Sequence, residues 1–78
     1  MTPTVRWHPA ALHILYRLPM HSAMLVDRAV LRFAERSEGH LRWSAPYYRL
    51  RAGLYEMALA IDRKARTVTV LFIYRMQL

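Results

Sequence analysis

The second half of the chain consists of segments whose side-chain character alternates from one residue to the next. Two of them lie within residues 47–62 on either side of Gly53, and a third covers residues 68–75 after a short polar stretch. A period of two is typical of a β-strand, whose successive side chains point to opposite faces. Gly53 either turns or bulges the chain, and residues 62–66 supply a second turn. This half therefore predicts an antiparallel meander of three strands.

The same alternation predicts which side chains share a face of the meander. Arg49 and Arg51 lie on one face of the first strand, opposite Leu50. On the middle strand, one face is expected to carry Tyr55, Met57, Leu59 and Ile61. On the last strand, one face is expected to carry Val68, Val70, Phe72 and Tyr74. One side of the sheet should carry helices, and the other should present two fixed cations to an anionic partner.

The first half of the chain predicts one strand and two helices. Residues 2–7 have the spacing of a short edge strand that tolerates a proline at its beginning. Pro9 suits the first position of a short helix, which ends before Pro19.

A longer helix follows, with apolar residues at steps of three and four. Ser22 is its predicted N-cap, and Gly39 is placed just past its last turn. Residues 40–46 are expected to form a connection, because Ser44 and Pro46 oppose a regular element there.

This order of elements predicts a two-layer α+β fold, β-α-α-β-β-β, with a helical hairpin packed on one face of an antiparallel sheet. With 78 residues, the chain is expected to form a single domain, residues 1–78. A domain of this size buries only ~60% of the surface that its unfolded chain exposes.

Composition excludes several kinds of site. The chain has no cysteine, so it has no disulfide and no thiolate metal or redox site. The histidines are not spaced as a helical ligand pair, and we predict no metal and no cofactor: His8, His13, His21 and His40. No apolar run approaches the ~20 residues that cross a bilayer, so no membrane role and a cytoplasmic location are expected.

The net charge of +7 comes from eleven arginines and one lysine against five acidic residues. Arginine's planar fork matches phosphate and stacks on bases, which favours RNA or an acidic protein as partner. A GC-rich genome would produce the same bias. The positions of the arginines therefore carry more weight than their number.

Four sequence segments resemble the RelE/ParE superfamily of toxins from type II toxin–antitoxin modules, which includes plasmid stabilisation proteins. They are VRWHPAAL near the start, LP between the helices, YRLRAGLYEMALAID and VTVLFIYR. They occur in the family's order and cover nearly the whole chain. The resemblance implies a RelE-like fold and a small basic toxin that is neutralised by an antitoxin encoded beside it, as a hetero-oligomer.

The resemblance leaves two activities open. RelE-like members are endoribonucleases that cleave messenger RNA in the ribosomal A site, whereas ParE-like members inhibit DNA gyrase without being hydrolases. Arg49 and Arg51 match the family's basic pair, and Arg75 matches a basic residue that closes the last strand. Glu56 occupies the place of a usual arginine and would serve as an unorthodox base. The family's terminal tyrosine has no counterpart except Tyr74, so a catalytically decayed homologue is a further alternative.

Two more sets of residues are assigned to binding. Tyr48, beside the predicted connection, is a candidate for stacking on RNA bases, with packing against the helices as its alternative. On the outer side of the long helix, an acidic amphipathic antitoxin segment could cover a mixed apolar and basic surface: Met24, Arg28, Leu31 and Arg32. The same surface could instead join two copies as a homodimer.

Overall fold

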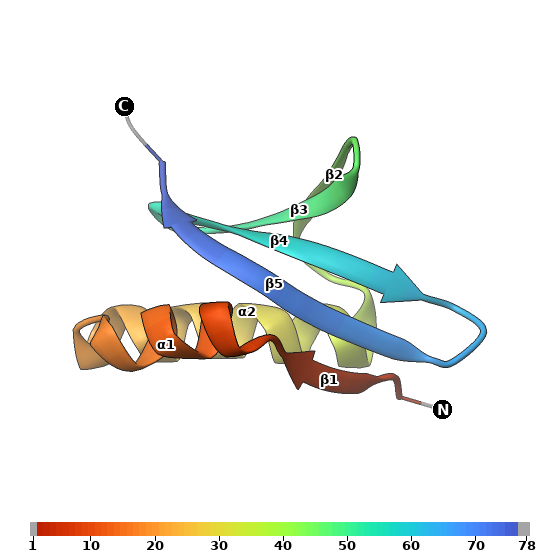
Figure 1. Ribbon diagram of the computed structural model, residues 1–78, viewed down its shortest axis with the longest axis horizontal. Coiled ribbons are helices and arrows are strands. Elements are labelled where there is room, and N and C mark those ends of the chain that lie inside the picture. The colour runs from red at the N-terminus through yellow and green to blue at the C-terminus, as the bar shows by residue number, and fades with distance from the viewer. Residues whose placement is uncertain (1, 77–78) are drawn as a thin grey trace.

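The computed structural model describes residues 2–76 and arranges them in two layers, with both helices on one side of a five-stranded sheet (Figure 1). The elements in chain order are β1 (Thr4–Trp7), α1 (Pro9–Arg17), α2 (Met20–Arg36), β2 (His40–Ser44), β3 (Tyr47–Ala52), β4 (Tyr55–Asp62) and β5 (Thr67–Arg75). The predicted α+β class, with a helical hairpin packed on a largely antiparallel sheet, is confirmed.

The strand order across the sheet is β1-β5-β4-β3-β2. The chain start forms an edge strand, as predicted, and β1 runs parallel to β5 while every other pair is antiparallel. The prediction of a connection over residues 40–46 is wrong. His40 pairs with Arg51 and Ser44 with Tyr47, because a complete backbone ladder with β3 outweighs the weak strand preference of the segment. Pro46 falls in the turn between β2 and β3, where it costs no ladder bond.

Helix α1 begins as the sequence predicts. Pro9 occupies the first turn, and the ring Nδ1 of His8 accepts a hydrogen bond from the backbone N–H of Ala10 at 3.1 Å. His8 thereby satisfies one of the N–H groups that a helix start leaves without a partner.

Helix α2 differs from its prediction at both ends. It begins at Met20 after Pro19, so Ser22 lies inside the first turn and is not the N-cap. At the other end Ser37, not Gly39, takes the left-handed conformation that ends the helix, with φ of 57°. Its backbone N–H donates a hydrogen bond to the Phe33 carbonyl oxygen at 2.8 Å, and the helix ends at Arg36, three residues before Gly39.

The core lies between the helices and the sheet. Its fully buried large side chains come from α2, β3, β4 and β5: Val26, Val30, Leu50, Met57, Leu59, Val70 and Ile73. Burying each such side chain stabilises the fold by about 1.5–3 kcal/mol, which fastens α2 to the sheet. This packing occupies only one face of the sheet.

A β-bulge between β4 and β5 changes which side chains face that core. Ala58 pairs with Phe72 but the next residue, Leu59, pairs with Val70, so β5 contains one extra residue at this point. The predicted common face of Val68, Val70, Phe72 and Tyr74 is therefore wrong. Val70 lies in the core, whereas Phe72 and Tyr74 point to the side without helices.

Candidate functional site

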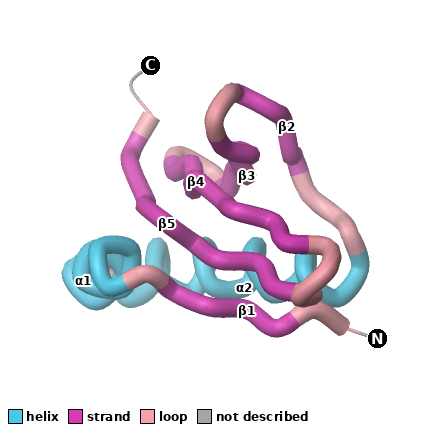
Figure 2. Tube along the Cα trace, turned by 45° about the vertical axis from the view of Figure 1, so that its right-hand side comes forward, coloured by secondary structure: helices cyan, strands magenta, loops and turns pink. Residues whose placement is uncertain are grey.

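We call the sheet surface that faces away from α1 and α2 the open face (Figure 2). The pairing registers align its side chains in two rows across four strands. One row contains Arg42, Arg49, Ala58 and Phe72, and the other contains His40, Arg51, Glu56 and Tyr74. Basic, acidic and aromatic groups from β2 to β5 thus come together on one surface.

Glu56 is at the centre of a hydrogen-bond network on the open face. Its carboxylate oxygen Oε1 accepts a bond from the Tyr74 hydroxyl at 2.7 Å and another from Arg42 Nη2 at 3.1 Å. Arg49 Nη1 donates to the Tyr74 hydroxyl oxygen, and its guanidinium carbon lies 5.4 Å from the centre of the Tyr74 ring. Four adjacent strands contribute one side chain each, so this network exists only in the folded sheet.

Burial gives the network unusual electrostatics. Only 6% of Glu56 is exposed, and it is the one buried charged residue within residues 2–76. A buried carboxylate needs hydrogen-bonding partners, which Arg42 and Tyr74 supply. Burial, together with the bond to Glu56, raises the pKa of Tyr74 above its ordinary value of 10.0. Near neutral pH, Tyr74 is therefore a neutral proton donor held against a carboxylate.

The two predicted arginines of β3 lie beside this network. Neither Arg49 nor Arg51 forms an ion pair, since the single salt bridge within the described chain joins Arg42 to Glu56. Glu56 forms no ion pair with either of them, although Arg51 lies directly opposite Glu56 in the pairing of β3 with β4. Two guanidinium groups remain available to an anion.

Arg75 does not join this cluster. It pairs with Tyr55, whose side chain packs against the core, so Arg75 lies on the helix side of the sheet. The sequence pattern could not show this, because the bulge shifts the alternation of β5 by one residue before Arg75.

Tyr48 also faces the helix side. Its ring packs edge-on against Trp43, with ring centres 4.8 Å apart, and it lies against the core. On the open face, the rings of Phe72 and Tyr74 stack with centres 6.3 Å apart. Phe72 is 45% exposed in the middle of its strand.

Sequence reasoning missed Arg42 and Phe72. Arg42 lies in the segment predicted as a connection, although the alternation of Leu41, Arg42 and Trp43 was a signal for a strand. No local signal reveals the bulge that exposes Phe72.

The proposed partner surface on α2 is accessible. Met24 is 45% exposed and Leu31 is 41% exposed, and Arg28 and Arg32 are exposed beside them. Arg28, Leu31 and Arg32 also line one shallow groove on the outer side of the helix.

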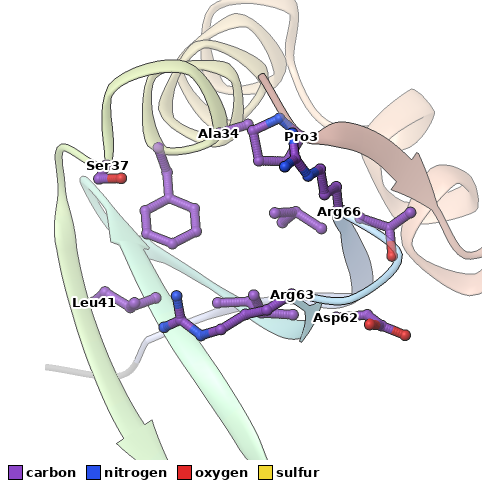
Figure 3. A pocket seen from close by; sticks show the side chains of 11 residues that line it. Pro3, Ala34, Ser37, Leu41, Asp62, Arg63 and Arg66 are labelled. Carbon is purple, nitrogen blue, oxygen red and sulfur yellow. The ribbon is translucent and has the colours of Figure 1, made fainter. Parts of the chain in front are cut away.

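A separate groove with both polar and apolar lining residues lies between the end of α2 and the far end of the sheet, with a volume of about 440 Å³. Figure 3 shows Leu41, Arg63 and Arg66 around this hollow. None of its lining residues belongs to the Glu56 network.

The described part of the chain contains no group of three histidine, aspartate or glutamate side chains that could hold a metal ion. None of the helices within residues 2–76 is both long and apolar enough to span a membrane.

Comparison with known proteins gives structural relatives. No family model matches the sequence, and no curated protein is significantly similar to it. Among solved structures, a chain of the toxin–antitoxin complex RelBE2 from Mycobacterium tuberculosis is 26% identical, with a TM-score of 0.70 over 97% of this chain and 100% of that one.

Two further complexes share the fold at lower identity. A chain of the archaeal RelE–RelB complex from Pyrococcus horikoshii is 17% identical, with a TM-score of 0.79 over 96% of each chain. A chain of the RelBE complex from E. coli is 15% identical, with a TM-score of 0.75 over 97% of this chain and 99% of that one.

Proposed function

By its fold the chain belongs to the RelE/ParE superfamily, and on that premise we propose that it is the toxin of a type II toxin–antitoxin module that cleaves messenger RNA. The toxin role rests on its likeness to chains of RelBE complexes over almost their entire length. The choice of RNA rests on one observation, the hydrogen-bonded cluster of Arg42, Arg49, Glu56 and Tyr74 on the open face.

RNA binding is supported by the cations that have no acidic partner. Arg49 and Arg51 offer planar donor groups that can bind phosphate oxygens in pairs. The exposed ring of Phe72 lies in the same row as Arg49 and offers a surface on which a base can stack.

Cleavage is proposed to proceed by attack of the RNA 2′-oxygen on the adjacent phosphorus. The 2′-hydroxyl proton passes to the Tyr74 oxygen while Tyr74 passes its own proton to Glu56, along the existing 2.7 Å hydrogen bond. The bond from phosphorus to the 5′-oxygen breaks, and water protonates that oxygen. The resulting hydroxide takes the proton back from Glu56, and the products are a 2′,3′-cyclic phosphate and a 5′-hydroxyl.

Arg49 is the residue proposed to stabilise this reaction, and its contact with the Tyr74 hydroxyl supports that role. Its charge would offset the negative charge that grows on the phosphoryl oxygens. Arg75 has no role in this scheme, since it lies on the other side of the sheet.

The partner that neutralises the toxin is proposed to be an antitoxin with an acidic, amphipathic segment. Such a segment would place apolar side chains on Met24 and Leu31 and carboxylates on Arg28 and Arg32. A toxin that acts on ribosome-bound messenger RNA would work in the cytoplasm.

A second candidate is a toxin of ParE type, which would bind DNA gyrase without chemistry, or a decayed homologue. The observation that favours it is the burial of Glu56 under Arg42 and Tyr74, which keeps the carboxylate from direct contact with a substrate. The proton relay through Tyr74 is what the nuclease requires and the binding toxin does not.

Inducible expression in a bacterial host tests the proposal. We expect growth arrest, transcripts cut with new 5′-hydroxyl ends, and rescue when a small acidic protein encoded beside the toxin gene is expressed with it. Tyr74→Phe should abolish the cuts, and Arg75→Ala should retain them. Arrest with DNA damage and intact transcripts would identify a gyrase ligand, and absence of arrest would identify a decayed homologue.

A further inference from the structure

The cationic surface does not stop at the edge of the open face. A groove of about 400 Å³ lies between α2 and the strands β2 and β3, and we call it the α2 groove. Its basic side chains come from three elements: Arg28 and Arg32 of α2, His40 of β2 and Arg51 of β3. Leu25, Ala29 and Leu50 give it apolar walls.

The charge of the α2 groove is largely unneutralised. Glu38 is the one acidic residue among its lining residues, and it forms no ion pair with these arginines within the described chain. Arg28 and Arg32 are four residues apart on the same side of the helix, where like charges repel each other. An anionic ligand would relieve that repulsion.

The α2 groove is continuous with the open face. His40 and Arg51 line it, and the same two residues line a hollow on the open face together with Arg42 and Glu56. A connected series of basic side chains therefore leads from Arg42, past Arg51 and His40, to Arg28 and Arg32 on α2.

We propose that the α2 groove extends the RNA site, so that a single strand leaving the open face places its next phosphates on Arg28 and Arg32. This inference rests on the proposed function and adds the path of the substrate to it. The combination of a cationic track with apolar walls suits the alternating phosphates and bases of a single strand. The acidic antitoxin segment proposed above would use the same two arginines and would therefore compete with RNA for them, but it would not explain the continuity of the α2 groove with the open face.

Binding of uncleavable 2′-deoxy-substituted RNA of increasing length tests the path. Oligonucleotides from about 4 to about 16 nucleotides cover the site sizes known for one OB-fold domain that binds single strands. Fluorescence anisotropy would compare the full-length toxin with the double variant Arg28→Gln/Arg32→Gln. The matched control is Arg63→Gln/Arg66→Gln, which removes two exposed cations from the turn after β4, beside the other groove.

We expect the shortest RNA to bind the toxin, the double variant and the control with the same affinity. The longest RNA should bind the toxin more tightly than the shortest, and Arg28→Gln/Arg32→Gln should lose that gain. For the longest RNA, the slope of log affinity against log salt should fall by about 1.4, which corresponds to two lost phosphate contacts on a single strand at about 0.7 each. The control variant should keep the tighter binding of the longest RNA, and its slope of log affinity against log salt should not show the decrease of about 1.4 expected for the double variant.

The inference fails if the double variant binds the long RNA as the toxin does, or if it weakens all lengths equally. Loss of antitoxin affinity with unchanged binding of long RNA would also overturn it, since the α2 groove would then belong to an acidic protein segment. If the toxin binds no RNA of any length, the proposed function fails as well. The two failures are thereby distinguishable.

Discussion

Glu56 is the residue at the centre of the hydrogen-bond network on the open face. One of its oxygens accepts bonds from a cation and from a phenol at the same time, and little of the residue is exposed. Such a carboxylate is held in place by its partners, because an unpaired charge at this depth would be costly. Its neighbour Tyr74 is thus oriented by Glu56 and contacted by Arg49.

Replacing Tyr74 by phenylalanine tests this orientation. The change removes one of two donors to the Glu56 oxygen, so we expect the free energy of unfolding to fall by about 1–2 kcal/mol. If the proposed proton relay operates, its loss should lower the rate of RNA cleavage by about 10²- to 10⁴-fold. Urea denaturation and a cleavage assay measure the two effects. Tyr16→Phe, on an exposed residue of α1, should change neither; an equal loss there would contradict the assignment.

The raised pKa of Tyr74 predicts a pH dependence of stability. Above pH 10.0 the tyrosine of the unfolded chain loses its proton while the folded one keeps it, so the folded state binds more protons. The stability contributed by Tyr74 is therefore complete below pH 10.0 and lost as the pH rises through the folded value. Urea denaturation from about pH 8 to about pH 11 should show a steeper alkaline loss for the natural chain than for Tyr74→Phe. Parallel curves would contradict the prediction.

Among the elements, β5 decides the composition of the open face. Its single extra residue opposite Ala58 and Leu59 leaves Val70 and Ile73 in the core but turns Phe72 and Tyr74 outward. The hairpin of β2 and β3 adds Arg42 and Arg49 to the same face.

The turn between β3 and β4 has a conformation that only glycine adopts without strain. Gly53 has a φ of +59°, and a Cβ atom there would lie 2.8 Å from Leu25 Cδ2 of α2. Gly53→Ala should lower the free energy of unfolding by about 1–2 kcal/mol through the backbone alone. Because the Leu25 methyl can move, adding Leu25→Ala should recover little of this loss. Urea denaturation of the single and double variants separates the backbone strain at residue 53 from the contact with Leu25. Full recovery of the free energy of unfolding in the double variant would show that the side-chain contact causes the loss.

At the scale of the whole molecule, the chain has a net charge of +7 over 78 residues. Folding brings these like charges closer together, so their mutual repulsion destabilises the compact state. The described residues contain one ion pair, so most of the arginines are balanced by solvent ions alone. The open face and the α2 groove together hold many of these unpaired cations.

Salt should therefore stabilise the free protein. Raising the salt concentration from about 0.05 M to about 0.5 M shortens the screening length and weakens the repulsion, so the urea midpoint should rise at constant slope. The urea midpoint of the variant Arg28→Gln/Arg32→Gln should rise less with salt, because its net charge is +5 (7 − 2). A midpoint that falls with salt would show that attractive pairs dominate.

Local patterns were enough to predict most of the elements. Alternation predicted β3, β4 and β5, proline spacing predicted α1, and apolar steps of three and four predicted α2. These sequence patterns predict the elements correctly because strand and helix geometry relate residues that are only a few positions apart in the chain. The meander also predicted that Arg49 and Arg51 share a face, as they do.

What the sequence alone determined, then, is the α+β layering and the paired arginines of β3. Tertiary structure alone decided that Glu56 would be buried under Arg42 and Tyr74, that Phe72 would face outward, and that Arg75 would face the helices. The physical reason is that strand pairing and core packing act between residues far apart in the chain. One unpaired residue in β5, stabilised by the burial of Ile73, outweighs the local alternation.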